Sequence, residues 1–357
     1  MNKVKVGILG ATGMAGQRYI QLLEKHPWFD VAFVAASKRS AGKKYEEAVA
    51  GRWHMSGSIP PTVAALNVFD VSDIEKAVSD CSLVFSAVDS KTAKEFEFKY
   101  AAAGLGVISN ASANRWVDDV PVIMPEVNPH HCELIPLQQK NRGFDKGFVV
   151  TKPNCSLQSY LMALAPLKEK FGLAKVVITT LQALSGAGFP GVSSMAIIDN
   201  VLPLISGEEE KSEREPGKIL GTIIDGKIKM DTSFAISAHC NRVATIDGHL
   251  ACVSVAFDKK PSKDEILKIW SEFKAFPQEQ NLPMAPKQPV IYIDEPDRPQ
   301  VRLDKDAGKG MAVTVGRLRD CPVFHYRFAC LSHNTIRGAA GGGILIGEML
   351  KEKGYLG

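Results

Sequence analysis

The chain has 357 residues, of which 45% are hydrophobic and 23% charged, and this is enough for two ordinary domains with full cores. Its net charge is only +4 and its basic and acidic residues are interspersed, which excludes the basic stripe of a nucleic-acid-binding protein but leaves small anionic ligands open. No apolar segment reaches the roughly 20 residues of a membrane span, and the seven cysteines lack the paired spacing of a disulfide framework or a zinc site. We therefore expect a cytoplasmic protein with reduced thiols and no bound metal.

The first 150 residues alternate between short apolar runs and stretches with helical spacing. Residues 4–9 are predicted to form a strand, and after a glycine turn a helix spans 14–25. Further strands are expected at 31–36, 82–88 and 106–109, with a helix at 92–103. This alternation implies a parallel, doubly wound sheet, so we predict an α/β protein with a Rossmann-like domain over residues 1–150.

A glycine pattern lies between the first strand and the first helix. Gly10 allows a tight turn, Gly13 lets the backbone approach a pyrophosphate, and Gly16 permits close packing of the helix on the sheet. A glycine-rich turn without a ligand is the alternative, but the strand–turn–helix context favours a dinucleotide site. The other predicted contacts from this segment are Thr12, Met14 and Ala15.

The end of the second expected strand indicates which dinucleotide binds. NAD-binding proteins usually carry an acidic residue there for the ribose hydroxyls, whereas this chain has Ser37, Lys38, Arg39 and Ser40. Two cations and two hydroxyls suit a phosphate, so we predict NADP rather than NAD. A solvated basic turn is the alternative.

Cys155 lies where an extended segment, residues 147–152, gives way to a helix predicted over 157–171. A thiol at a helix N-terminus experiences the positive end of the helix dipole and unpaired N–H groups, which favour the thiolate. The position therefore suits a nucleophile, although the usual fate of a free cysteine is a small buried side chain.

From residue 147 onward the pattern changes to strands, several with period-2 alternation, expected at 176–184, 235–237, 250–257, 312–318 and 324–331. We predict a second, α+β domain over residues 151–333 whose sheet is mixed or largely antiparallel. A polar segment at 207–217 is rich in Glu and Lys. The last segment, 334–353, is expected to be a helix that returns to the first domain, so that residues 334–357 complete that domain.

A nicotinamide cofactor and an activated cysteine together indicate oxidation of an aldehyde through a thioester. Such a reaction needs an acid/base near the carbonyl oxygen, and His249 is the candidate because it begins a predicted strand after an Asp-Gly turn. Arg242 lies seven residues before it. Of the other histidines, His239 and His333 are not excluded, and those expected at the surface are His26, His130 and His131.

These residues and their order resemble the aspartate-β-semialdehyde dehydrogenase family, in particular the branch typical of archaea and fungi. The resemblance extends over nearly the whole chain. It rests on the glycine loop with Gly16-Gln17, the turn from Ala36 to Gly42, Ser109-Asn110-Ala111 with Arg115, Pro125 to Asn128, Asn154-Cys155-Ser156, Gln182 to Gly188, Arg242 with His249, and His333 to Gly343.

The resemblance implies reversible, NADP-dependent phosphorylating oxidation of L-aspartate 4-semialdehyde to L-4-aspartyl phosphate, used reductively in lysine, threonine and methionine biosynthesis. It implies that Cys155 carries the acyl group, that Gln182 orients the substrate and that Asn154 lies at the oxyanion. Arg242 would bind the substrate carboxylate, Glu208 its ammonium group, and Arg115 with Lys211 the inorganic phosphate. The remaining implied contacts to phosphate or cofactor are Asn110, Ser86, Ser185, Gly186, Asn334 and Gly338.

Two alternatives stay open. A reductase of malonyl-CoA or of acetylglutamyl phosphate would keep the same two domains, a cysteine and NADP, although Asn154 and the pair Glu208 and Lys211 favour the aspartyl substrate. A catalytically silent NADP-binding regulator would have lost the reacting residues, which are present here. The run from Glu208 to Lys211 has a simpler interpretation as a solvated helix start. By the resemblance, and because the second sheet needs a covering surface, we expect a homodimer or homotetramer in which the second domain is both catalytic and dimerising.

Overall fold

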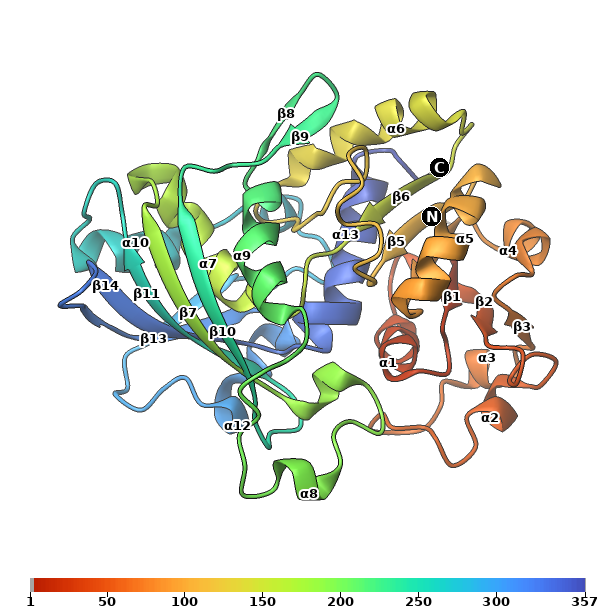
Figure 1. The fold of residues 1–357 in the computed structure, drawn as a ribbon. Helices are drawn as coiled ribbons and strands as arrows, with labels where there is room; N and C mark the ends of the chain where they lie inside the picture. Colours follow the sequence, from red (N-terminus) through yellow and green to blue (C-terminus); the bar gives the residue numbers. More distant parts are fainter. Residues whose placement is uncertain (1–2, 357) are drawn as a thin grey trace.

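The structure, a computed structural model, describes residues 3–356 and contains two large sheets (Figure 1). The first sheet is parallel throughout, in the order β3-β2-β1-β4-β5-β6, and the strand order reverses between β1 and β4. In open α/β sheets ligands bind at the carboxyl ends of the strands at such a reversal. The strands are β1 (Val4–Leu9), β2 (Phe29–Ala36), β3 (Val68–Asp70), β4 (Leu83–Ser86), β5 (Gly106–Ser109) and β6 (Phe148–Thr151).

Helices cover both faces of the first sheet, because its central strands are apolar and buried on both sides. On one face Tyr19 of α1 packs with Phe85 and Ile344, and on the other Tyr100 of α5 packs with Val107. The helices of this half are α1 (Met14–Leu23), α2 (Tyr45–Ala48), α3 (Pro61–Ala64), α4 (Ile74–Asp80), α5 (Ser90–Ala102), the 3₁₀ helix η1 (Pro129–Leu134) and α6 (Ile135–Arg142).

The second sheet is mixed, in the order β10-β7-β11-β14-β13-β12. Its three inner pairings are antiparallel, whereas β10 with β7 and β12 with β13 are parallel. A separate antiparallel hairpin joins β8 and β9. The strands are β7 (Lys175–Gln182), β8 (Thr222–Ile224), β9 (Lys227–Lys229), β10 (Ala235–Arg242), β11 (His249–Ala256), β12 (Val290–Ile293), β13 (Val313–Asp320) and β14 (Tyr326–Ser332).

One face of the second sheet packs on α7 and α10, where buried Trp270 donates its indole N–H to the carbonyl oxygen of Ala163. The other face carries the alternate strand residues, among them the half-buried Val177 and Thr179 and the exposed Cys252. The helices of this half are α7 (Leu157–Phe171), η2 (Leu184–Ala187), α8 (Ser194–Ile197), α9 (Glu208–Ile219), α10 (Lys263–Glu272), α11 (Phe276–Glu279), α12 (Val301–Asp304) and η3 (Ala307–Gly310).

The C-terminal segment returns to the first sheet. After β14 the chain forms a π-helical turn, η4 (Ile336–Ala340), and then α13 (Gly341–Glu352), which packs on α1 and β5 (Figure 1). A Cβ on Gly343 would collide with the hydroxyl of Tyr19, so glycine allows this close contact. Arg337 anchors the turn by donating two 2.6 Å hydrogen bonds to the carboxylate of Glu126, and both side chains are fully buried.

The predicted fold class is confirmed, since a parallel doubly wound sheet and a mixed second sheet are both present. The strands expected at 4–9 and 106–109 and the helix at 157–171 match residue for residue. The strand expected at 235–237 continues to Arg242, and the polar segment 207–217 lies almost entirely in helix α9. Four short strands, β3, β8, β9 and β12, have no counterpart in the prediction, and all but β12 have only three residues, which is too few to carry a periodic signal.

The prediction of surface positions for His26 and His131 is wrong. His26 is 4% exposed, and its Nε2 lies 2.7 Å from a carboxylate oxygen of Glu348. His131 lies between the side-chain amide of Asn128 and the carbonyl oxygen of Gly221, and burial lowers its pKa to about 4. Each histidine forms a hydrogen bond to a residue far away in the sequence, Glu348 for His26 and Gly221 for His131. A local polar pattern does not reveal such contacts.

Within residues 3–356, no helix combines the length and apolar character that crossing a bilayer requires.

Candidate active site

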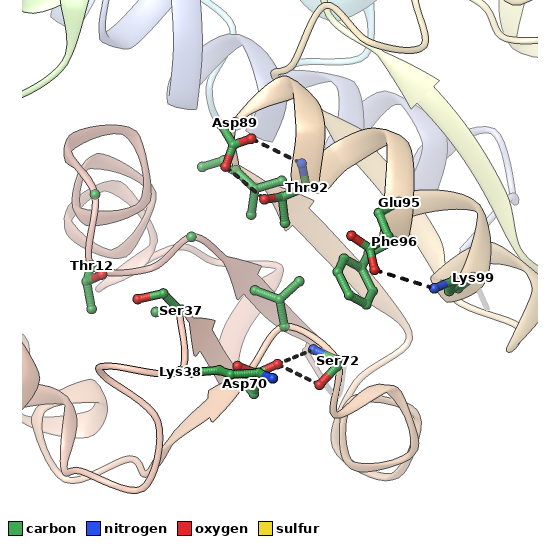
Figure 2. A pocket seen from close by; sticks show the side chains of 16 residues that line it. Thr12, Ser37, Lys38, Asp70, Ser72, Asp89, Thr92, Glu95, Phe96 and Lys99 are labelled. Carbon is green, nitrogen blue, oxygen red and sulfur yellow. Dashed lines mark hydrogen bonds and ion pairs between the residues drawn. The ribbon is translucent and has the colours of Figure 1, made fainter.

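A cavity of about 800 Å³ lies at the carboxyl ends of the first-sheet strands (Figure 2). Gly10, Thr12 and Gly13 line it from the turn before α1, and Ser37 and Lys38 line it from the end of β2. Gly10 has φ +74°, and a Cβ there would lie 2.6 Å from a backbone carbonyl oxygen. Glycine is therefore required for the turn. The first turn of α1 contains two further predicted contacts, Met14 and Ala15.

A carboxylate that the sequence analysis missed lines the same cavity. Asp70 ends β3 beside Ala36 in the strand register, and Figure 2 shows its side chain next to that of Lys38. Partial burial raises the pKa of Asp70, but hydrogen bonds from Ser72 and the charge of Lys38 outweigh it and hold the pKa below its ordinary value. Of the four contacts predicted in the turn after β2, Ser37 and Lys38 line the cavity, whereas the exposed Arg39 and the buried Ser40 do not. The other predicted cofactor contacts outside its lining are Met14, Ala15, Ser86, Ser185, Gly186, Asn334 and Gly338.

Cys155 lies two residues before α7, with its Sγ atom 3.5 Å from Nε2 of His249. Burial and the charge of Glu208 raise the pKa of the thiol. The charges of Lys152, Arg115 and Arg242 lower it, but they do not reverse the net direction. Burial and Glu208 thus oppose ionisation of Cys155, and the three cations favour it.

The backbone of one residue, Ala183, orients both His249 and Arg242. The N–H of Ala183 donates to Nδ1 of His249 over 3.0 Å, and its carbonyl oxygen accepts from Nη1 of Arg242 over 2.7 Å. Because Nδ1 accepts, the neutral imidazole carries its proton on Nε2, which faces Cys155. Burial and the charge of Arg242 lower the pKa of His249 to about 3, so the ring is neutral near pH 7.

Glu208 gathers three predicted site residues. It lies in the first turn of α9 and accepts from Nδ2 of Asn154 at 2.9 and 3.0 Å and from Nζ of Lys211 at 2.8 Å. Nε2 of Gln182 lies 3.4 Å from the same carboxylate. Burial raises the pKa of Glu208, but Lys211 and the two amides outweigh it and hold the pKa below its ordinary value. The Asn154 amide, predicted at an oxyanion, is therefore directed to Glu208.

Arg115 reaches the site from the loop after β5 and is 4% exposed. Its Nε donates to the carbonyl oxygen of Lys152 and its Nη2 to that of Asn110, while Nη1 donates to Glu215 over 2.7 Å. The ammonium group of Lys152 is itself buried, and burial together with Arg115 lowers its pKa to about 8. Two predicted residues, Arg115 and Asn110, thus meet two that were not predicted, Lys152 and Glu215.

Two glycines expected to contact the cofactor lie against the reacting side chains. A Cβ on Gly338 would lie 2.8 Å from the Cβ of Cys155, and one on Gly186 would lie 2.9 Å from Nη1 of Arg242. Only glycine therefore allows the C-terminal turn to lie this close to Cys155, and the loop after β7 to lie this close to Arg242.

Asn334 ties these loops together. Its Nδ2 donates to Oγ of Ser185 over 2.8 Å, and its Oδ1 accepts from the N–H of Gly248 over 2.8 Å. Gly248 directly precedes His249, so Asn334 also holds the start of β11. Ser86, another predicted contact, is fully buried at the end of β4.

Simple signals could have located two of the missed residues. Lys152 ends the extended segment before Cys155, and Glu215 follows Glu208 by seven residues, which places both glutamates on one face of a helix. Asp70 gave no such signal, because its strand was not predicted. In the described part of the chain, no three His, Cys, Asp or Glu side chains gather as a metal site requires.

Two family models match the chain. The model of the "Semialdehyde dehydrogenase, NAD binding domain" matches residues 5–135, and that of the "Semialdehyde dehydrogenase, dimerisation domain" matches residues 164–337. The first match contains the turns that line the cavity, and the second contains His249 and Glu208.

Full-length relatives carry the same name. An aspartate-semialdehyde dehydrogenase of Archaeoglobus fulgidus is 47% identical over 98% of this chain and 99% of its own length. An aspartate-semialdehyde dehydrogenase of Cryptococcus neoformans is 44% identical over 99% of this chain and 98% of its own length. The crystal structure of aspartate semialdehyde dehydrogenase with NADP from Candida albicans superimposes with a TM-score of 0.91 at 40% identity, covering 99% of this chain and 100% of that one. The chain therefore belongs to the aspartate-semialdehyde dehydrogenase family, as its archaeal and fungal resemblance predicts.

Proposed function

We propose that this chain converts L-aspartate 4-semialdehyde, NADP and phosphate reversibly into L-4-aspartyl phosphate, and that it works reductively in lysine, threonine and methionine biosynthesis. The observation that carries the proposal is the position of Cys155 Sγ, 3.5 Å from His249 Nε2 and within reach of the charges of Arg242 and Glu208. The substrate has an aldehyde, a carboxylate and an ammonium group. Each meets a partner of suitable chemistry: Cys155, Arg242 and Glu208.

The first-sheet cavity fits the phosphate-bearing part of NADP. Its lining offers hydroxyls from Thr12 and Ser37 and the ammonium group of Lys38, and all three groups suit phosphate oxygens. Arg39, next in the chain and exposed, would add a guanidinium at the rim. Bound NADP supplies the hydride acceptor for the oxidation.

Cys155 forms the covalent bond to the substrate. Its thiolate adds to the aldehyde carbon, and the carbonyl electron pair moves to the oxygen. When hydride leaves that carbon, the oxygen re-forms a carbonyl and the product is a thioester, so the oxygen need not gain or lose a proton. His249 stabilises the alkoxide by donating its Nε2–H. A second proton on Nδ1 would break the bond from Ala183, which favours the neutral donor over the charged acid.

Substrate binding itself promotes the thiolate. Glu208 is the carboxylate that raises the pKa of Cys155. A substrate ammonium group paired with Glu208 would offset its charge and leave Lys152, Arg115 and Arg242 to favour the ionised sulfur. Substrate binding would thus weaken one of the two causes that oppose ionisation of Cys155, the other being its burial.

The incoming phosphate dianion is attracted by the positively charged side chains around Cys155, which outnumber the carboxylates there. Four cations lie around Cys155 against two carboxylates: Arg115, Lys152, Lys211 and Arg242 against Glu208 and Glu215. Phosphate at Arg115 and Lys211 attacks the thioester carbon, and the thiolate leaves as the acyl phosphate forms. Lys152 adds a buried cation to this set.

We propose a homo-oligomer, either a dimer or a tetramer, built on the second sheet. The dimerisation model covers that sheet, and the face opposite α7 leaves Cys252 exposed and Val177 half-buried. A second copy would cover these residues. All seven cysteines are thiols, which suits the reducing cytoplasm as the proposed location.

The test consists of two parallel activity assays on the purified protein. Phosphate-dependent formation of NADPH from aspartate semialdehyde is the expected activity, and omission of phosphate is the control. Oxidation of NADPH by malonyl-CoA alone would replace the proposal with the reductase alternative. No turnover with either substrate would indicate a silent regulator.

A further inference from the structure

Glu215 joins Arg115 to the loop that carries the nucleophile. It lies on α9 and is 1% exposed. Its Oε1 accepts from Nη1 of Arg115 at 2.7 Å, and its Oε2 accepts from the backbone N–H of Asn154 at 2.8 Å. Asn154 directly precedes Cys155. One buried carboxylate therefore connects the cation proposed for phosphate with the backbone beside the reacting sulfur.

Only a carboxylate can make both contacts at this length. The two partners are N–H donors, and an ionised carboxylate offers two acceptor oxygens and no donor. A glutamine would accept from one partner and turn its NH₂ group toward the other. An aspartate keeps both acceptors but is one methylene shorter, so it cannot span the same two partners.

Glu208 holds the same residue from the same helix face. It precedes Glu215 by about two helical turns and accepts from the side-chain amide of Asn154, whereas Glu215 accepts from the Asn154 backbone. Because Asn154 is fixed at two points by α9, the position of the nucleophile loop follows that helix.

Arg115 is equally constrained. Its Nε and Nη2 donate to the carbonyl oxygens of Lys152 and Asn110, and Nη1 is aligned by Glu215. Lys152 precedes Cys155 by three residues in the same segment. A shift of the guanidinium would therefore reach the nucleophile loop by two routes, through the Lys152 carbonyl and through Glu215.

We propose that Glu215 is a positioning residue that couples the phosphate site to the nucleophile: it aligns Arg115 for phosphate and at the same time fixes the Asn154–Cys155 backbone. The inference rests on the proposed function, since it assigns Arg115 to phosphate. Without Glu215, phosphate binding weakens and the sulfur is misplaced. Misplacement by about 1 Å can lower the rate roughly 100-fold.

The test compares Glu215→Gln with the wild-type protein and with Glu210→Gln, which changes an exposed glutamate of the same helix. The readouts are kcat, the KM for phosphate, and the phosphate concentration that half-protects Cys155 from iodoacetamide, followed by mass spectrometry. The last readout needs no turnover. We expect Glu215→Gln to raise both phosphate constants at least about tenfold and to lower kcat, while Glu210→Gln behaves as wild type.

The outcomes separate this inference from the proposed function. A wild-type protein without turnover and without phosphate protection would overturn the proposed function. Wild-type turnover with unchanged phosphate constants in Glu215→Gln would overturn the role of Glu215, even if stability or kcat fell. If Glu215→Gln does not fold, Glu215→Asp carries the test with the same expectations, and failure of both to fold would make the role purely structural.

Discussion

The backbone N–H of Ala183 donates to Nδ1 of His249 over 3.0 Å, while Nε2 of the same ring lies 3.5 Å from Sγ of Cys155. A donor facing Nδ1 disfavours a proton there. The ring is thus fixed as the neutral tautomer that presents Nε2–H to the site of reaction.

This arrangement predicts a loss of stability in acid. The pKa of His249 is lowered from 6.5 to about 3 by burial and by Arg242, so between these values the unfolded chain binds a proton that the folded protein does not. The free energy of unfolding should therefore fall as pH drops from 6.5 toward 3, by up to about 1.4 kcal/mol per pH unit from this group. Urea unfolding of His249→Asn against pH should show a shallower slope than wild type. An identical slope would contradict the assignment, and His239→Asn at an exposed site is the control.

Replacing Cys155 with serine should abolish turnover without affecting cofactor binding. The sulfur forms the thioester, and an alkoxide is not available at neutral pH, so we expect kcat to fall at least about 1,000-fold. The dissociation constant of NADP should be unchanged, because Cys155 does not line the first-sheet cavity. Steady-state kinetics and fluorescence titration measure the two quantities, with Cys252→Ser as the control. Turnover near the wild-type rate would refute the thioester mechanism.

The parts of the fold that the sequence predicted are those with a strong local signal. The helix 157–171 and the strand 4–9 are long or strongly apolar, and each ends beside Gly or a polar residue. β3 is too short for periodicity to register. The segment 207–217 was predicted only as polar, with a solvated helix start as one interpretation of its first residues, whereas α9 packs Glu208, Ser212 and Glu215 inward.

The residues of the candidate site also fall into those with a local sequence signal and those without one. Cys155 and His249 could be located by position, since a helix start and a strand start each have a pattern. The resemblance supplied Arg242 and Arg115, but no pattern shows that Glu215 satisfies both Arg115 and Asn154, because that contact spans 100 and 61 residues of chain. Long-range hydrogen bonds are fixed by tertiary packing, which a single sequence does not display.

Replacing Asp70 with asparagine should tighten NADP binding. The carboxylate lies beside Lys38 in the cavity, where it competes with a phosphate for the ammonium group and repels the phosphate charge. Removing one charge at a partly solvated site should lower the dissociation constant of NADP about three- to tenfold and leave that of NAD nearly unchanged. Calorimetry with both dinucleotides measures this, and Glu75→Gln on α4 is the control. Equal effects on NAD and NADP would show that Asp70 does not contact the phosphate region.

Breaking the pair of Glu126 and Arg337 should destabilise the protein strongly. Both side chains are fully buried with two 2.6 Å hydrogen bonds, and Glu126→Gln would leave a buried guanidinium without its counter-charge. We expect a loss of about 3–5 kcal/mol in the free energy of unfolding. The exposed pair of Lys263 and Asp320 is the comparison, where Lys263→Gln should change the free energy of unfolding far less, because water screens both charges. If denaturant titrations gave similar losses in the free energy of unfolding for both variants, burial would not explain the contribution of the Glu126–Arg337 pair.

Adding one methyl group at Gly338 should impair catalysis more than stability. A Cβ there would lie 2.8 Å from the Cβ of Cys155 and 3.1 Å from its Cα, so either the π-helical turn or the nucleophile must move. Overpacking costs about 1–3 kcal/mol, and displacement of the sulfur by about 1 Å should lower kcat roughly 100-fold. Gly347→Ala is the matched control, because its Cβ would lie 3.3–3.4 Å from side chains of Phe85, Ile108 and Phe29, in the same C-terminal segment but away from Cys155. We expect Gly347→Ala to change stability while keeping kcat, and equal losses of kcat in the two variants would show that the effect is general strain in the C-terminal segment.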